Sequence, residues 1–226
     1  MREKLIDSFG RVHKDLRISV TDRCNFRCTY CMPAEGLDWV PRDELLTFEE
    51  IERVARLSVE QFGIESIRIT GGEPTVRARL PVLIKKLAQL PVDLSMTTNG
   101  ATLRVLSKDL VSAGLKRINI SLDSLQPDRF RELTLRDNLP QVLDGIQAAV
   151  EAGLDPVKVN VVVMAGVNDD EIVDFARFGR EKGVIVRFIE FMPLDASEGW
   201  TNNQVVTQAQ IVAEINSEFP LESVKR

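Results

Sequence analysis

Six short runs rich in β-branched residues recur along this chain, and a helical pattern follows each of them. The runs begin at Leu16, Ser66, Val92, Arg117, Val157 and Val184, and helices are expected at about 47–62, 79–89, 106–113, 127–133, 139–152, 169–182 and 207–218. Successive β–α units form parallel strands with right-handed crossovers. The sequence therefore predicts an α/β fold, a partial (β/α)6 TIM-like open barrel of parallel strands, with a doubly wound sheet as the alternative.

The two faces of these strands differ in character. Alternate residues point to opposite sides of a strand, and one side carries almost only apolar residues. The other side carries Arg17, Ser19, Thr21, Arg68, Thr70, Ser95, Thr97, Asn119, Ser121, Asp123, Lys158 and Asn160. A closed eight-stranded barrel fills its lumen with branched apolar side chains, so this pattern predicts instead a hydrated lumen that holds a ligand among three cations. The alternative is a half-exposed sheet whose polar face is only solvated.

The overall composition excludes several classes of partner. Of 226 residues, 44% are apolar and 28% charged, as in ordinary soluble proteins, and the net charge is −5. A negative net charge gives no general affinity for nucleic acid or anionic membranes. No apolar run reaches the length of a membrane span, and the amino-terminal residues do not resemble a secretory signal. We therefore expect a cytoplasmic protein with reduced thiols.

All three cysteines fall within the stretch "CNFRCTYC", directly after the first strand. Catalytic loops occupy this position in parallel α/β folds. A structural zinc site needs four ligands, and the single histidine, His13, would have to fold back across the first strand to complete one. Three thiolates at this spacing suit a cubane iron–sulfur cluster with one iron left for an external ligand. Zinc and unligated thiols remain alternatives at this point.

The cysteine stretch resembles the cluster-binding loop of the radical S-adenosylmethionine (SAM) superfamily, and "GGEP" at residues 71–74 is similar to its SAM-binding turn. The resemblance implies that Cys24, Cys28 and Cys31 hold a [4Fe–4S] cluster, whose fourth iron is chelated by SAM. One electron from the reduced cluster then cleaves the bond between the sulfonium and the 5′ carbon. Gly71 and Gly72 would let the backbone lie against the methionine moiety, and Glu73 would offset its α-ammonium charge.

Longer strings resemble the GTP 3′,8-cyclase family of molybdenum cofactor biosynthesis, among them "RINISLDSL", "VKVNVVVMAGVNDDE" and "RFIEFMPL". This family implies a lyase that converts GTP to (8S)-3′,8-cyclo-7,8-dihydroguanosine 5′-triphosphate. The positions that match imply SAM contacts at Tyr30, Gly72, Ser121 and Met192, and GTP contacts at Arg17, Arg68, Thr97 and Lys158. The alternatives are ring packing for the tyrosine, loop packing for the methionine, backbone bonds for the hydroxyls and surface ion pairs for the cations.

The resemblance also sets expectations for organisation and partners. It implies one radical SAM domain, with an extension at 1–14 and the barrel at 15–219. It also implies an electron donor such as flavodoxin or ferredoxin and a downstream cyclic pyranopterin monophosphate synthase, and leaves a homodimer open. The family carries a second cysteine triad further along, whereas this sequence ends at "EFPLESVKR", so we expect a fragment or a shortened relative without that region. Two competing readings are a radical SAM enzyme for a peptide or another small molecule, and a zinc-stabilised binding domain.

Overall fold

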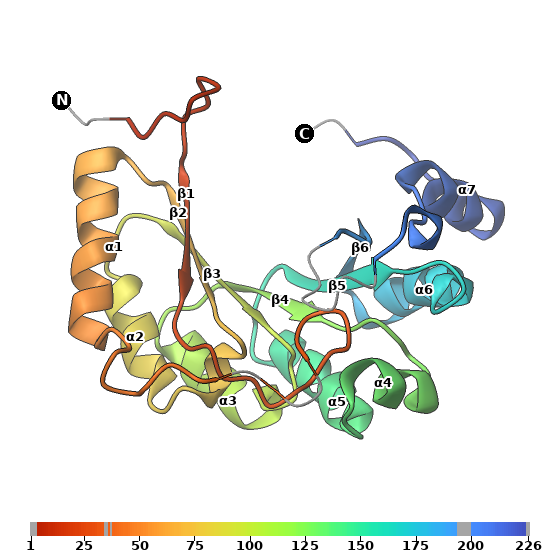
Figure 1. Ribbon diagram of the computed structural model, residues 1–226, viewed down its shortest axis with the longest axis horizontal. Coiled ribbons are helices and arrows are strands. Elements are labelled where there is room, and N and C mark those ends of the chain that lie inside the picture. The colour runs from red at the N-terminus through yellow and green to blue at the C-terminus, as the bar shows by residue number, and fades with distance from the viewer. Residues whose placement is uncertain (1–3, 34–35, 37, 194–199, 225–226) are drawn as a thin grey trace.

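A curved sheet of six parallel strands forms the centre of the computed structural model, which describes residues 4–33, 36, 38–193 and 200–224 (Figure 1). The strands are β1 (Asp15–Ser19), β2 (Ser66–Thr70), β3 (Asp93–Thr98), β4 (Arg117–Ser121), β5 (Val157–Val163) and β6 (Ile185–Glu190). Each strand pairs with its neighbours in sequence, so β1 and β6 are the two edges. A doubly wound sheet would reverse its strand order at a central strand. The predicted open barrel of six β–α units is confirmed.

Seven helices of the described residues accompany these strands. They are α1 (Phe48–Phe62), α2 (Leu80–Leu87), α3 (Leu103–Ser112), α4 (Pro127–Thr134), α5 (Leu139–Glu151), α6 (Ile172–Lys182) and α7 (Gln208–Glu218), with short 3₁₀ turns η1 (Pro74–Val76), η2 (Asp169–Glu171) and η3 (Asn202–Gln204). The helices from α1 to α6 follow the outer, convex side of the sheet (Figure 1). The concave side is therefore left to the polar residues of the strands.

Local sequence signals fix the helix ends where capping groups are present. The Thr47 hydroxyl accepts a hydrogen bond from the Glu50 amide while the Glu50 carboxylate accepts from the Thr47 amide, and these two bonds form a capping box. Helix α3 begins at Leu103, three residues earlier than predicted, and its N-cap Thr102 makes no side-chain capping bond. A start without a cap gives no local signal, so its position is set by the burial of Leu103 in the core.

The core lies between the apolar face of the sheet and the surrounding helices. Ile67, Ile69, Met96, Ile120 and Val159 are completely buried there, as the alternation of the strands predicts. Burying each such side chain contributes about 1.5–3 kcal/mol relative to leaving it in water. Among the residues that the structure describes, none of the helices combines the length and the apolar character that crossing a membrane would need.

Candidate functional site

The loops that follow the strands meet at the carboxyl end of the sheet, where the cysteine stretch packs on the glycine turn. The Gly72 amide donates to the Thr21 carbonyl at 2.7 Å, and the Glu73 amide donates to the Arg23 carbonyl at 2.8 Å. A Cβ on Gly71 would lie 2.6 Å from the Thr21 oxygen, and one on Gly72 would lie 2.5 Å from the Arg23 oxygen. Both glycines are thus required where one loop touches the other, a reason that the sequence alone did not supply.

The Glu73 carboxylate organises this turn from a buried position. Only 1% of Glu73 is exposed. Its Oε1 accepts hydrogen bonds from the Thr75 amide, the Thr75 hydroxyl and the Thr98 hydroxyl, and its Oε2 accepts from the Asn99 amide at 2.6 Å. A carboxylate offers about four acceptor positions, so Oε2 retains about one for a further donor. The side chain therefore joins the ends of β2 and β3 and keeps limited capacity for the predicted α-ammonium group.

The middle of the cysteine loop, around Cys28, runs along the end of α4. The Arg27 amide donates to the Thr134 carbonyl at 3.0 Å, and the Thr29 amide donates to the Leu133 carbonyl at 2.9 Å. These carbonyls belong to the last turn of the helix, where no intrahelical amide remains to satisfy them. The loop therefore caps α4 and is held by it.

The three thiols are free, and they influence one another. Cys24 and Cys28 are partly buried and Cys31 is exposed. Burial is the main cause that raises the pKa of each thiol, and for Cys28 the negative charges of Asp123 and of the other two cysteines raise the pKa further. Three thiolates this close need positive charge between them, which the irons of a cluster would supply. The donor set therefore fits the predicted [4Fe–4S] group.

A single zinc ion fits this loop less well. His13 lies beside Asp7, with 3.5 Å between its Nε2 and the carboxylate, in the segment before β1. The fourth ligand that a structural zinc site requires is therefore engaged elsewhere.

Tyr30 is held at both ends of its side chain. Its hydroxyl donates to Asp123 Oδ2 at 2.5 Å, and its ring stands edge-on to Phe191 with 6.4 Å between centroids. Burial raises the pKa of Asp123 to about 6 and raises that of Tyr30 above its ordinary value. Two other predicted SAM residues come from the same end of the sheet: partly buried Ser121 ends β4, and Met192, which is 50% exposed, follows Phe191.

The polar face of the sheet gathers more cations than the sequence pattern suggested. In register across the strands, Arg17 lies beside Arg68, Arg68 beside Ser95, and Ser95 beside Arg117. The next row places Thr97 beside Asn119 and Asn119 beside Lys158. These pairings bring all four predicted GTP residues onto two adjacent rows.

The pKa of Arg68 is affected by several neighbouring positive charges. Its pKa is lowered by burial and then by the charges of Arg17, Arg187 and Arg117. Sequence reasoning missed the last two. Arg117 shares a face with Asn119, which was an available signal, whereas Arg187 shares its face with Ile185 and Ile189, so the pattern of β6 gave no signal. Arg187 pairs with Asn160 of the polar face, which places Arg187 on that face as well.

A small pocket opens among these cations. Arg68, Arg117 and Lys158 line it together with Ser95 and Asn119. The Nε atoms of Arg68 and Arg117 are buried and have no hydrogen-bond partner among the described residues. Buried donors of this kind are normally satisfied, so they point to an anionic or polar ligand. A larger hollow of about 320 Å³ lies at the amino-terminal end of β3, beside Asp93 and Lys116, away from all predicted site residues.

Comparison with known proteins places this arrangement in a family. The profile of the radical SAM superfamily matches residues 18–179. The GTP 3′,8-cyclase of Streptomyces coelicolor is 50% identical over 219 residues, which are 96% of this chain and 64% of that protein. The GTP 3′,8-cyclase of Geobacter sulfurreducens is 48% identical over 225 residues, 99% of this chain and 68% of that protein. The chain thus spans less than two thirds of the first of these relatives.

The fold has its own counterpart among solved structures. Methylornithine synthase (PylB) superposes with a TM-score of 0.69 at 17% identity, over 91% of this chain and 62% of that one. At this level of identity the likeness concerns the fold alone. Since the superfamily profile covers more than half of the chain and the cyclase relatives align with nearly all of it, this protein belongs to the radical SAM superfamily and, within it, to the family of GTP 3′,8-cyclases.

Proposed function

We propose that this chain provides the cluster- and SAM-binding barrel of an enzyme that converts GTP to its 3′,8-cyclised dihydroguanosine triphosphate. The observation that carries the proposal is the group of cations around Arg68 on the polar face, beneath the cysteine loop. Arg17, Arg117 and Arg187 all act on Arg68 as like charges, and although Arg117 also pairs with Asp93, this concentration of positive charge favours a polyanion. A nucleoside triphosphate is the class of ligand that supplies such charge, with forked bonds from arginine and a point charge from lysine.

The residues divide the site into two levels along the strands. Ser121 lies four positions beyond Arg117 on β4, which corresponds to about 13 Å of strand. At the lower level, Arg17, Arg68, Thr97 and Lys158 hold the triphosphate in this proposal, and Arg117 and Arg187 join them. At the upper level, SAM lies against Tyr30, Gly71, Gly72, Glu73, Ser121 and Met192. The nucleotide sugar then points from the lower level toward the SAM ribose.

The chemistry is shared between the cofactors and the chain. The superfamily's cofactors are a [4Fe–4S] cluster and SAM, which together supply one-electron cleavage of the sulfonium. Cys24, Cys28 and Cys31 are the proposed cluster ligands. The chain's own task is to orient SAM above the nucleotide and to hold the target carbon still, because a misplacement of about 1 Å can cost on the order of a hundredfold in rate.

The remaining expectations belong to this proposal. We place the chain in the cytoplasm as one domain with an extension at 1–14, and give it a flavodoxin- or ferredoxin-like electron donor. Its product would pass to a cyclic pyranopterin monophosphate synthase. A homodimer would be visible as a doubled mass in light scattering of the reconstituted protein.

Calorimetry with two ligands tests the nucleotide assignment. Anaerobically reconstituted protein is titrated with GTP and with guanosine, and the same is done for Arg17→Ala and Arg68→Ala. Each variant should weaken GTP binding by roughly 1.5–3 kcal/mol, the value of a hydrogen bond to a charged group, and leave guanosine almost unchanged. Arg104→Ala is the control, because Arg104 is an exposed cation that pairs with Asp144 and Glu151 on the outer helices. Equal weakening of both ligands would remove the phosphate site from this face.

A further inference from the structure

The two halves of the cysteine loop are held in different ways. Backbone bonds from Arg27 and Thr29 to the end of α4 fix the stretch around Cys28. The half that carries Cys31 is a short turn, in which the Cys31 and Met32 amides donate to the Cys28 carbonyl at 2.9 and 3.1 Å. A turn of this kind is stable only when something else holds it.

The Tyr30 side chain provides that support through Asp123. Its hydroxyl bonds to one oxygen of the Asp123 carboxylate, and the other oxygen accepts from the Val162 amide of β5 at 2.7 Å. Only 6% of Asp123 is exposed, so these bonds are sheltered from water. One carboxylate therefore connects the cysteine loop with the ends of two strands.

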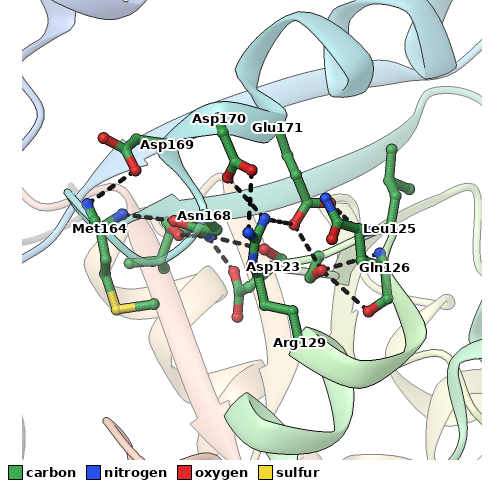
Figure 2. A network of polar contacts seen from close by, with 12 residues as sticks. Asp123, Leu125, Gln126, Arg129, Met164, Asn168, Asp169, Asp170 and Glu171 are labelled. Carbon is green, nitrogen blue, oxygen red and sulfur yellow. Dashed lines mark hydrogen bonds and ion pairs between the residues drawn. The ribbon is translucent and has the colours of Figure 1, made fainter.

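Asn168 fixes the backbone that carries this carboxylate. Figure 2 shows Asn168 between Asp123 and Met164, on the turn that leads into η2. Its Nδ2 donates to the carbonyls of Asp123 and Val162 at 2.7 and 2.8 Å, and its Oδ1 accepts from the Met164 amide at 2.7 Å. All hydrogen-bonding positions of the amide except one acceptor site are used, and the side chain is 1% exposed. Asp123 is thus presented to Tyr30 from a rigid support.

A second polar group lies beside the first and does not contact Tyr30. The buried Glu171 accepts from the Ser124 hydroxyl, the Leu125 amide and Arg129, which also pairs with Asp170 (Figure 2). This group joins α4 to η2. Like Asp123, Glu171 is buried and accepts from one hydroxyl and one backbone amide, and it also pairs with Arg129, so it offers a control for a purely structural role.

We propose that Asp123 is a positioning residue for the cluster: through Tyr30 it orders the turn at residues 30–32, which carries Cys31, before any iron is bound. The inference rests on membership of the radical SAM superfamily and not on GTP as substrate. Without the Tyr30–Asp123 hydrogen bond, the exposed Cys31 would lose its fixed position relative to Cys28. Ordering the loop when the cluster binds would then reduce the free energy of cluster binding. Preordering instead favours capture of the cluster and slows its loss.

Hydrogen exchange of the metal-free, reduced chain tests this directly. In Tyr30→Phe and Asp123→Ala, the Cys31 and Met32 amides should exchange about ten- to a hundredfold faster, as expected when a hydrogen bond to a charged acceptor is lost. The Arg27 and Thr29 amides should stay within about twofold of the wild type, because α4 holds them. Asp123→Asn should fall between, since its amide oxygen still accepts from Val162 and its NH₂ can still meet the Tyr30 oxygen.

Cluster retention gives a second readout that is independent of turnover. After reconstitution, Tyr30→Phe and Asp123→Ala should release iron to a chelator faster than the wild type, while the control Glu171→Gln should lose global stability without a change at Cys31 and Met32. Wild-type exchange at these two amides in Tyr30→Phe would overturn the proposal. So would an equal acceleration in Glu171→Gln, because the network would then act only on general stability.

Discussion

Replacing Gly72 by alanine should separate the glycine turn from the cysteine loop. The new Cβ would overlap the Asp22 carbonyl oxygen and lie 2.5 Å from that of Arg23, whereas ordinary contact begins at 3.4 Å. The loop backbone must therefore retreat by at least about 0.9 Å, the difference of these two values, since the Asp22 oxygen is closer still. Both obstacles are main-chain atoms, so no side-chain rotation can relieve them.

The magnitude follows from two contributions. Overpacking of this kind costs about 1–3 kcal/mol. The retreat also stretches the bonds from the Gly72 and Glu73 amides to Thr21 and Arg23, each worth about 1 kcal/mol. Together these predict that the free energy of unfolding falls by roughly 3–5 kcal/mol.

Urea denaturation of the metal-free protein, with its thiols reduced, measures this loss as a lower midpoint at constant slope. The control is Gly166→Ala, where a Cβ meets nothing within 4 Å but φ is +72°. That change should cost only backbone strain, about 1–2 kcal/mol. Gly72 is not among the residues with positive φ, so its cost comes from contact alone. A loss below about 0.5 kcal/mol in Gly72→Ala, within the scatter of surface substitutions, would refute the reasoning.

Two further outcomes concern the cofactors. Cys28→Ala should lose the stable cluster and with it 5′-deoxyadenosine formation, because two thiolates leave two irons without protein ligands. Iron content and product analysis measure this. Formation of 5′-deoxyadenosine at the normal rate would contradict the ligand assignment. A protein made of these 226 residues alone should cleave SAM slowly without coupled cyclisation of GTP, since its relatives extend well beyond the aligned region. Incubation with dithionite, SAM and GTP tests this, and equal amounts of 5′-deoxyadenosine and cyclised product would argue against it.

The strands and helices were predictable because their signals are local. Alternation in β2 to β5 identified the buried face, and the capping boxes at Thr47 and Thr207 fixed two helix starts. Helix α3 lacked such a cap and was predicted to start too late. Regular periodicity therefore carries the architecture, while an uncapped end depends on packing that a single segment does not reveal.

The site was predictable only in part, because much of it depends on pairs that are distant in sequence. The Tyr30–Asp123 hydrogen bond joins residues 93 positions apart, and no local sequence pattern around either residue predicts this contact. The glycines at 71 and 72 were expected to approach a ligand, yet the structure presses them against the backbone of the cysteine loop. Strand register places Arg187 with the other cations, whereas in its own strand it shares a face with Ile185 and Ile189, which gives no sign of a polar face.

The crowding of positive charge around Arg68 makes the stability of the barrel depend on its surroundings. The Debye screening length is about 8 Å at physiological ionic strength, so salt should already weaken part of the repulsion between these side chains. A polyanion that binds only the folded state adds more, about 2.7 kcal/mol at a hundred times its dissociation constant. By mass action, the melting temperature of the barrel would then rise with the concentration of that anion, and if the proposed phosphate site is correct, inorganic triphosphate alone should act as a folding ligand.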